Sequence, residues 1–136
     1  MPASLTRTVR FRATHRLSRD DWSAEENRRR FGWTTEPHAH EYACQVTVAG
    51  AVDEHAPMVM DLALLDRLLA DVVVRRLDRK ALPDDLGEFR GVLPTCEAIA
   101  RDVFRRLEPR LPDGVRLIKV RIEEDPTLAA EWTHDA

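Results

Sequence analysis

The sequence has few of the features that mark secreted, disulfide-bonded or membrane proteins. Only two cysteines occur, Cys44 and Cys96, and their separation matches no paired motif. The longest candidate apolar run, residues 62–74, is interrupted by three charged side chains and is too short to span a bilayer. Because the first residues also lack the apolar core of a secretory signal, we expect reduced thiols and a cytoplasmic location.

Positive charge is not in excess either. The 21 Lys and Arg residues face 24 Asp and Glu residues, which gives a formal net charge of −3 and no global field to attract nucleic acid or anionic lipid. Apolar types supply 43% of the chain and charged types 33%, a balance typical of a folded globular protein. No internal repeat or low-complexity segment occurs. With 136 residues, the chain predicts a single domain over 1–136 that binds neither nucleic acid nor membrane.

Alternation of apolar and polar residues predicts four strands. The first covers residues 6–15, the second 38–48, the third opens after Pro112-Asp113-Gly114 and reaches Glu124, and a short fourth covers 128–133. The charge-rich stretch between the first two strands, residues 18–37, is interpreted as a long excursion, and long loops inside compact domains often carry function.

Two amphipathic helices are predicted between the second and third strands. Asp61 is a good N-cap for a helix that ends near Asp78, and Thr95 caps a second helix that stops before Pro109. The order strand, strand, helix, helix, strand, strand predicts an α+β fold, with an antiparallel sheet covered on one face by the two helices.

Three histidines are candidates for a metal centre. His38 and His40 are separated by one residue, so a strand projects both imidazoles from one face, roughly 7 Å apart along the chain. His15 closes the first strand, and pairing of the two strands would bring it beside them. Three neutral imidazoles with one open position form a catalytic zinc arrangement. The alternative is a surface coincidence or a hydrogen-bonded pair in the core.

Glu124 is a second unusual residue. It falls on the apolar side of its strand directly after Ile122, where a carboxylate needs a partner and can anchor a ligand. The alternative is that the strand ends at Ile122 and leaves Glu124 in solvent.

Several segments resemble one known family. Residues 11–17, Phe-Arg-Ala-Thr-His-Arg-Leu, look like the first-strand motif of the 6-pyruvoyl-tetrahydropterin synthase and 6-carboxy-tetrahydropterin synthase family, and residues 38–42, His-Ala-His-Glu-Tyr, look like its HGHNY motif. Residues 58–62, 77–82, 94–97 and 120–127 follow in the family's order and approximate spacing. The resemblance therefore covers nearly the whole chain.

The resemblance implies a tunnelling fold, a four-stranded antiparallel sheet with two helices, in trimers that stack into a homohexamer with active sites between subunits. By the same likeness His15, His38 and His40 hold Zn2+, and Glu124 holds the guanidine-like edge of a pterin ring. Thr95 and Glu41, which lie in matching segments, are further candidates for substrate binding.

The sequence departs from the family at its proton-transfer groups. The family's cysteine lies four or six residues before the first histidine of the pair, where this chain has Thr34 and Gly32. Neither Cys44 nor Cys96 matches that position, and both are interpreted as packing thiols. In the family's Asp-His pair, Asp78 matches but Arg79 replaces the histidine, and its guanidinium fork is suited to a phosphate or carboxylate of the substrate.

A threonine hydroxyl is a much poorer base than a thiolate, so a changed reaction or substrate is expected. The candidates for proton transfer are Thr34, Glu36, Glu41, Asp78, His134 and a zinc-bound hydroxide. Glu36, Glu41 and His134 are each also consistent with an ordinary solvated residue.

The predicted function is that of a zinc-dependent lyase or cyclase. The substrate would be a dihydropterin or a related polyhydroxylated heterocycle, transformed by elimination, isomerisation or retro-aldol chemistry with a base other than cysteine. The alternatives are an enzyme of a specialised pathway that makes or breaks a carbon–carbon bond in a non-pterin substrate, and a noncatalytic zinc-containing oligomer that binds a pterin.

Overall fold

The computed structural model describes residues 2–134, and its centre is one sheet of five strands in the order β3-β1-β2-β4-β5. The strands are β1 (Pro2–His15), β2 (His38–Ala51), β3 (Ala81–Leu82), β4 (Val115–Asp125) and β5 (Leu128–Thr133). Neighbouring strands are antiparallel except β3, which pairs with β1 in parallel. The expectation of a four-stranded, wholly antiparallel sheet is therefore wrong by one strand, because two residues are too few to show an alternating pattern.

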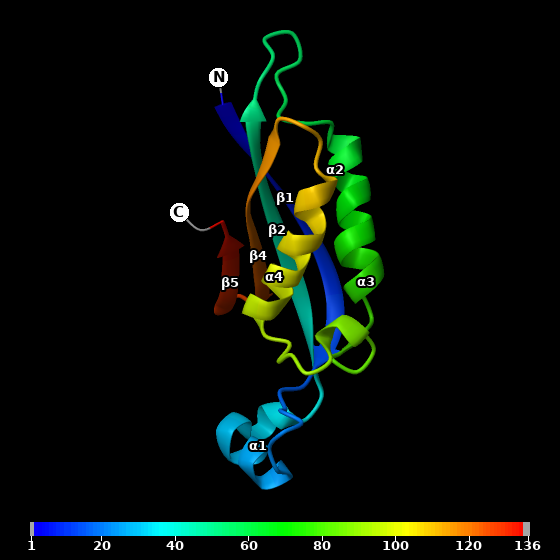
Figure 1. Cartoon of the computed structure of the whole chain (residues 1–136), viewed down its shortest axis with the longest axis vertical. Coiled ribbons are helices and arrows are strands. Elements are labelled where there is room, and N and C mark those ends of the chain that lie inside the picture. Colours follow the sequence, from blue (N-terminus) through cyan, green and yellow to red (C-terminus); the bar gives the residue numbers. More distant parts are fainter. Residues whose placement is uncertain (1, 135–136) are drawn as a thin grey trace.

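Both predicted helical stretches are present. A continuous stretch consists of α2 (Leu62–Leu69), a π-helical turn (Ala70–Val74) and α3 (Arg75–Leu77), and α4 spans Cys96–Leu107. Asp61 and Thr95 cap them as expected, each accepting a backbone N–H. The two stretches lie on the same face of the sheet (Figure 1), and their apolar stripes bury the ring pair Phe11 and Tyr42 with many aliphatic side chains.

The segment between β1 and β2 is more ordered than the sequence indicated. It contains α1 (Ala24–Phe31) and a 3₁₀ turn, η1 (Gly32–Thr35), which lie beyond one end of the strands (Figure 1). Ser23 caps α1 by accepting the Glu26 N–H, and Glu26 pairs with Arg30 one turn later. The helix was not predicted because only one of its eight residues is a large apolar one, so no stripe marks its period.

Two register shifts in β4 decide which of its side chains enter the core. Strict alternation back from Ile122 would place Ile118 on the core face, but the shift opposite Thr47 and Val48 buries Leu117 instead. A second shift, between Glu123 and Asp125, leaves Glu124 outside the ladder with β5. Bulges of this kind re-aim a side chain, and here the side chain is a carboxylate at the end of a strand.

No helix within residues 2–134 is long and apolar enough to cross a membrane.

Candidate metal centre

The register of β1 and β2 brings the three predicted histidines together. His15 lies directly opposite His38, and His40 follows two residues along β2 on the same face. The ring centroids of His15 lie 4.4 Å from His38 and 4.9 Å from His40, and one nitrogen of each of the three lies within 4.8 Å of the other two. His15 is buried and the other two are half-buried, so the cluster opens to one side.

Two of the imidazoles are oriented by main-chain carbonyls. His15 donates its Nδ1–H to the carbonyl of Pro94 at 2.8 Å, and His38 donates its Nδ1–H to the carbonyl of Glu36 at the same distance. Since a carbonyl can only accept, both rings carry their proton on Nδ1, which leaves the Nε2 lone pairs free. Metal-binding histidines are generally fixed by such a contact of the second nitrogen.

The third ring supplies the observation that favours a metal most directly. Nε2 of His40 is buried and forms no hydrogen bond in the part of the chain that the structure describes, although Oε2 of Glu124 lies 3.3 Å from it. A buried polar atom without a partner is costly, and a cation bound to it removes that cost. Burial lowers the pKa of His15, partly offset by its hydrogen bond to Pro94, and so favours the neutral form that binds metals. The three residues therefore fit a zinc ion in donor type and arrangement.

Glu124 lies beside this cluster. Its Oε2 is 3.3 Å from Nε2 of His40, and its Oε1 accepts a hydrogen bond from Sγ of Cys96, also at 3.3 Å. The side chain is only 14% exposed, and β4 continues to Asp125, so the alternative of a strand that ends at Ile122 is wrong. A largely buried carboxylate thus lies next to the candidate metal-binding histidines, where a small molecule could contact both.

Thr34 and Glu36 lie just before His38 in the sequence, but neither side chain contacts the three histidines among the described residues. The Thr34 hydroxyl donates to the carbonyl of Phe31 within the 3₁₀ turn, so it is used locally. The Glu36 side chain is exposed, while its carbonyl fixes His38. Glu36 therefore has an exposed carboxylate on the residue whose main chain contacts His38.

The other predicted residues have contacts elsewhere. Glu41 points to the opposite face of the sheet and pairs with Arg12 at 2.8 Å. The Thr95 hydroxyl caps α4 by accepting the N–H of Ala98. Neither of these contacts involves one of the three histidines.

Asp78 and Arg79 form a turn against the edge of β1. Asp78 accepts the backbone N–H of Arg12 at 2.9 Å, and the backbone N–H of Arg79 donates to the Arg12 carbonyl. Arg79 has φ of 62°, a left-handed conformation unusual for a residue other than glycine, and its side chain is 89% exposed. Within residues 2–134 neither side chain hydrogen-bonds to a histidine of the centre.

His134, a candidate for proton transfer, lies at the other end of the sheet. It pairs with Glu108, and its ring meets the ring of Phe104 edge-on. Its neighbour Thr133 lies opposite Lys119, which pairs with Thr47, about 30 Å along β2 from His38 at the rise of a strand. Within its own chain His134 therefore lies far from the three histidines.

Trp33 is a residue of the centre that the sequence did not single out. Its indole lies 4.8 Å from the His38 ring between centroids, and it is 70% exposed. The turn that carries it is tied to the residue after Arg16, since the N–H of Leu17 donates to the carbonyl of Thr34 at 2.9 Å. In the sequence, Trp33 is marked only by its position five residues before His38. That position does not show whether the indole packs in the core or lies at the surface beside the histidines.

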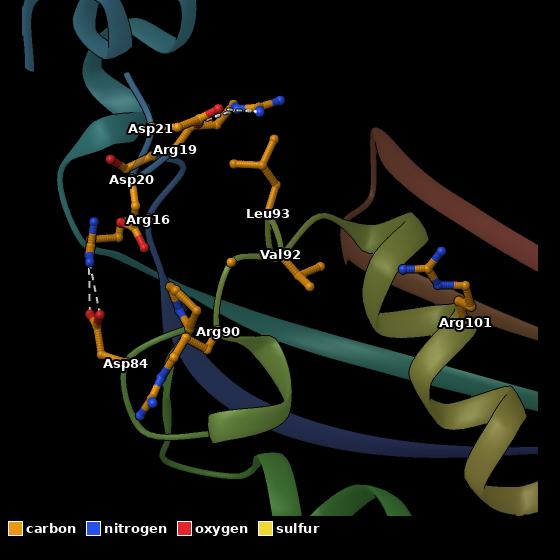
Figure 2. Close-up of a pocket in the computed structure, with 12 residues that line it drawn as sticks. Arg16, Arg19, Asp20, Asp21, Asp84, Arg90, Val92, Leu93 and Arg101 are labelled. Carbon is orange, nitrogen blue, oxygen red and sulfur yellow. Dashed lines mark hydrogen bonds and ion pairs between the residues drawn. The ribbon is translucent and has the colours of Figure 1, made fainter. Parts of the chain in front are cut away.

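A cavity of about 870 Å3 has Leu93, the residue before Pro94, in its wall. Figure 2 shows charged side chains around it, of which Arg16 forms a two-bond pair with Asp84, at 2.8 and 3.1 Å. Arg19 pairs with Asp21 in the same way. Most of the charges around the cavity are thus neutralised locally, and its link to the centre is the Leu93-Pro94 segment, which orients His15 through the Pro94 carbonyl.

These features define an α+β protein with a three-histidine cluster and a largely buried carboxylate at one end of its sheet. The chain matches the family model of 6-pyruvoyl tetrahydropterin synthase over residues 4–135, and it belongs to that family. The resemblance inferred from the sequence motifs is therefore confirmed.

Known members of the family match nearly the whole chain. The human 6-pyruvoyl tetrahydrobiopterin synthase is 38% identical over 124 residues, which are 90% of this chain and 85% of that protein. The structure of the Caenorhabditis elegans 6-pyruvoyl tetrahydropterin synthase superposes with a TM-score of 0.92 at 30% identity and covers 99% of this chain and 97% of that one. A Plasmodium vivax 6-pyruvoyltetrahydropterin synthase, solved with a catalytic glutamate replaced by cysteine, has a TM-score of 0.68 at 14% identity, a likeness that shows the fold alone.

Proposed function

We propose that the chain is a zinc-dependent lyase or cyclase that acts on a dihydropterin or a related polyhydroxylated heterocycle. The observation that carries the proposal is the convergence of His15, His38 and His40, with Oε2 of Glu124 at 3.3 Å from His40. Family membership and the synthase names of the relatives support the pterin part. We further propose that the chain acts as one domain in a trimer or hexamer.

The two parts of the centre would bind two different parts of the substrate. Zinc bound to the three Nε2 atoms would lower the pKa of a substrate hydroxyl and stabilise negative charge as an adjacent carbon loses its proton. Glu124 would accept two parallel N–H donors from the ring edge, the geometry in which a carboxylate binds a guanidinium. Pro94 and Glu36 contribute through their carbonyls, which hold His15 and His38 in place.

The base is not a cysteine. Burial raises the pKa of Cys44 to about 12, and burial together with the Glu124 contact raises that of Cys96 to about 12, so both stay protonated near neutral pH. Thr34, at one of the family's cysteine positions, has its hydroxyl turned to Phe31.

Glu36 is our first candidate for the base, because its main chain is fixed beside His38 and its carboxylate is exposed. A glutamate is catalytic in the Plasmodium vivax protein named above. The assignment of Glu36 rests on its position here. Asp78, supplied by a neighbouring subunit with Arg79 as an anion clamp, is the second candidate.

The test is product analysis with zinc-loaded protein and dihydroneopterin triphosphate, followed by mass spectrometry. We expect turnover that Glu36→Gln lowers by about a hundredfold or more, the contribution of a general base. Glu25→Gln, an exposed glutamate at the start of α1, is the matched control and should leave turnover unchanged. Absence of any product from this or other dihydropterins, with zinc shown to be bound, would contradict the enzymatic proposal.

Arg79 at the family's histidine position and Thr34 at its cysteine position favour a second candidate function, a noncatalytic pterin-binding protein. In that case pterins would raise the melting temperature without conversion. An enzyme of a specialised pathway that acts on a carbon–carbon bond of a non-pterin substrate would instead show neither stabilisation nor product with pterins.

A further inference from the structure

The contact between Cys96 and Glu124 is the only one that joins the N-terminal end of α4 to the carboxylate of the centre through side chains among the described residues. We propose that Cys96 is a positioning residue, whose thiol holds one oxygen of Glu124 so that the other faces the three histidines. The inference rests on the proposed function in one respect, the assignment of Glu124 to the ring edge of the substrate.

The thiol is the donor in this contact. Sγ of Cys96 lies 3.3 Å from Oε1 of Glu124, and Cys96 is only 2% exposed. Burial, with the carboxylate nearby, keeps the pKa of the thiol at about 12, so the sulfur retains its proton and the carboxylate accepts it. Cys96 therefore packs in the core, as the sequence indicated, and in addition donates a hydrogen bond that the sequence did not reveal.

The contact matters for Glu124 because of where this residue lies in β4. The residue lies at the register shift between Glu123 and Asp125, outside the ladder with β5. A carboxylate on a bulge can rotate, whereas one held at Oε1 has a defined plane. A fixed plane is what two parallel N–H donors require, and it favours a ring that carries both donors over one that carries a single donor.

Cys44 provides a natural control. It is the other cysteine, it is also fully buried, and among residues 2–134 its thiol has no side-chain hydrogen bond. A change that affects any buried thiol would affect both residues, whereas a positioning role is specific to Cys96.

The first test measures the contact itself through the S–H stretching band in the infrared. In Cys44→Ala protein the remaining Cys96 band should lie at lower frequency than the Cys44 band measured in Cys96→Ala protein, because a hydrogen bond weakens the S–H bond. Glu124→Ala should move the Cys96 band up. A Cys96 band that does not respond to Glu124→Ala overturns the proposal.

The second test measures ring selection with two fluorescent probes, pterin and lumazine, on zinc-loaded protein. Lumazine has an oxygen where pterin has its amino group, and so lacks one of the two donors. We expect Cys96→Ala to lower the preference for pterin about tenfold, the effect of one misplaced hydrogen bond to a charged group. Cys96→Ser should restore it, and Cys44→Ala should not change it. Equal preferences in the wild type and Cys96→Ala overturn the positioning role.

The two tests separate this inference from the function on which it rests. If the wild-type protein binds neither probe, the pterin proposal fails, and the infrared band still decides whether Cys96 holds Glu124.

Discussion

The chemistry of the centre depends on which nitrogen of each histidine is free. His15 and His38 each use Nδ1 in a hydrogen bond to a main-chain carbonyl, and the buried Nε2 of His40 forms no hydrogen bond among the described residues. Each of these two hydrogen bonds joins a ring nitrogen to a main-chain carbonyl that the fold already fixes, so the Nε2 lone pairs of His15 and His38 are directed before any metal is bound. Preorganisation of this kind reduces the entropy that binding must overcome.

We predict that His38→Ala and His40→Ala each weaken zinc binding by more than about a hundredfold, since loss of an outer partner alone costs about 10–100-fold. His55→Ala is the matched control, because His55 is exposed in the turn after β2. Metal content after dialysis against a chelator, measured by elemental analysis, checks the result. Equal zinc in His40→Ala and His55→Ala would contradict the centre.

Both thiols should react slowly in the folded protein. A pKa raised to about 12 lowers the thiolate fraction at pH 8 below that of free cysteine, and only the thiolate is alkylated. We expect iodoacetamide to modify Cys44 and Cys96 more than about tenfold more slowly than it modifies free cysteine. Mass spectrometry before and after unfolding in urea measures this. Rapid labelling of Cys96 in the folded state would argue for a thiolate at the centre.

Trp33 should report the presence of a metal. Its ring is 4.8 Å from His38, so Co2+ bound in place of zinc should quench its fluorescence by short-range energy transfer. We predict strong quenching in the wild type that Trp33→Phe largely removes. Trp22→Phe is the control, since Trp22 stacks on Phe31 in the α1 segment. Quenching that survives Trp33→Phe would place the metal elsewhere.

The secondary-structure elements differ in how far the sequence predicts them. The helix capped by Thr95 and the strand at 128–133 have the predicted bounds because caps and alternation are local signals. The two-residue β3 and the bulge at Glu124 depend on pairing between distant segments, which no local pattern carries. The grouping of the three histidines could be predicted because it follows from the pairing of two predicted strands. The contact of Cys96 with Glu124 could not be predicted, because it joins a helix to a bulge.

The cap of α4 allows a prediction at the level of one element. Thr95→Ala removes the acceptor for the Ala98 N–H and should lower the free energy of unfolding by about 1 kcal/mol. The conservative change Thr95→Ser keeps a hydroxyl acceptor and should retain most of that stability. Urea unfolding monitored by circular dichroism measures both variants. If Thr95→Ala instead weakens pterin binding with no loss of stability, Thr95 contacts the substrate rather than the helix.

At the level of the whole molecule, Asp78 and Arg79 are the predicted site residues whose side chains do not reach the histidine cluster of their own chain. They lie against β1 through the backbone of Arg12, and neither side chain hydrogen-bonds to a histidine of the centre within residues 2–134. The five-stranded sheet has β3 and β5 at its edges, and within residues 2–134 no further strand pairs with either edge. An assembly of several copies, which we propose, would place Asp78 at a neighbour's centre.

Mixing two inactive variants tests this arrangement. Asp78→Asn keeps an oxygen that accepts the Arg12 N–H, so the turn should survive, while His38→Ala removes a ligand. If each site takes its histidines from one subunit and Asp78 from another, a site is intact only when the first is an Asp78→Asn copy and the second a His38→Ala copy. About a quarter of the sites should then recover in an equal mixture of re-formed oligomers. Product formation measures the recovery, and sedimentation measures the oligomer. A monomer in sedimentation, or an oligomeric mixture as inactive as its parts while both variants are individually inactive, would confine each site to a single chain.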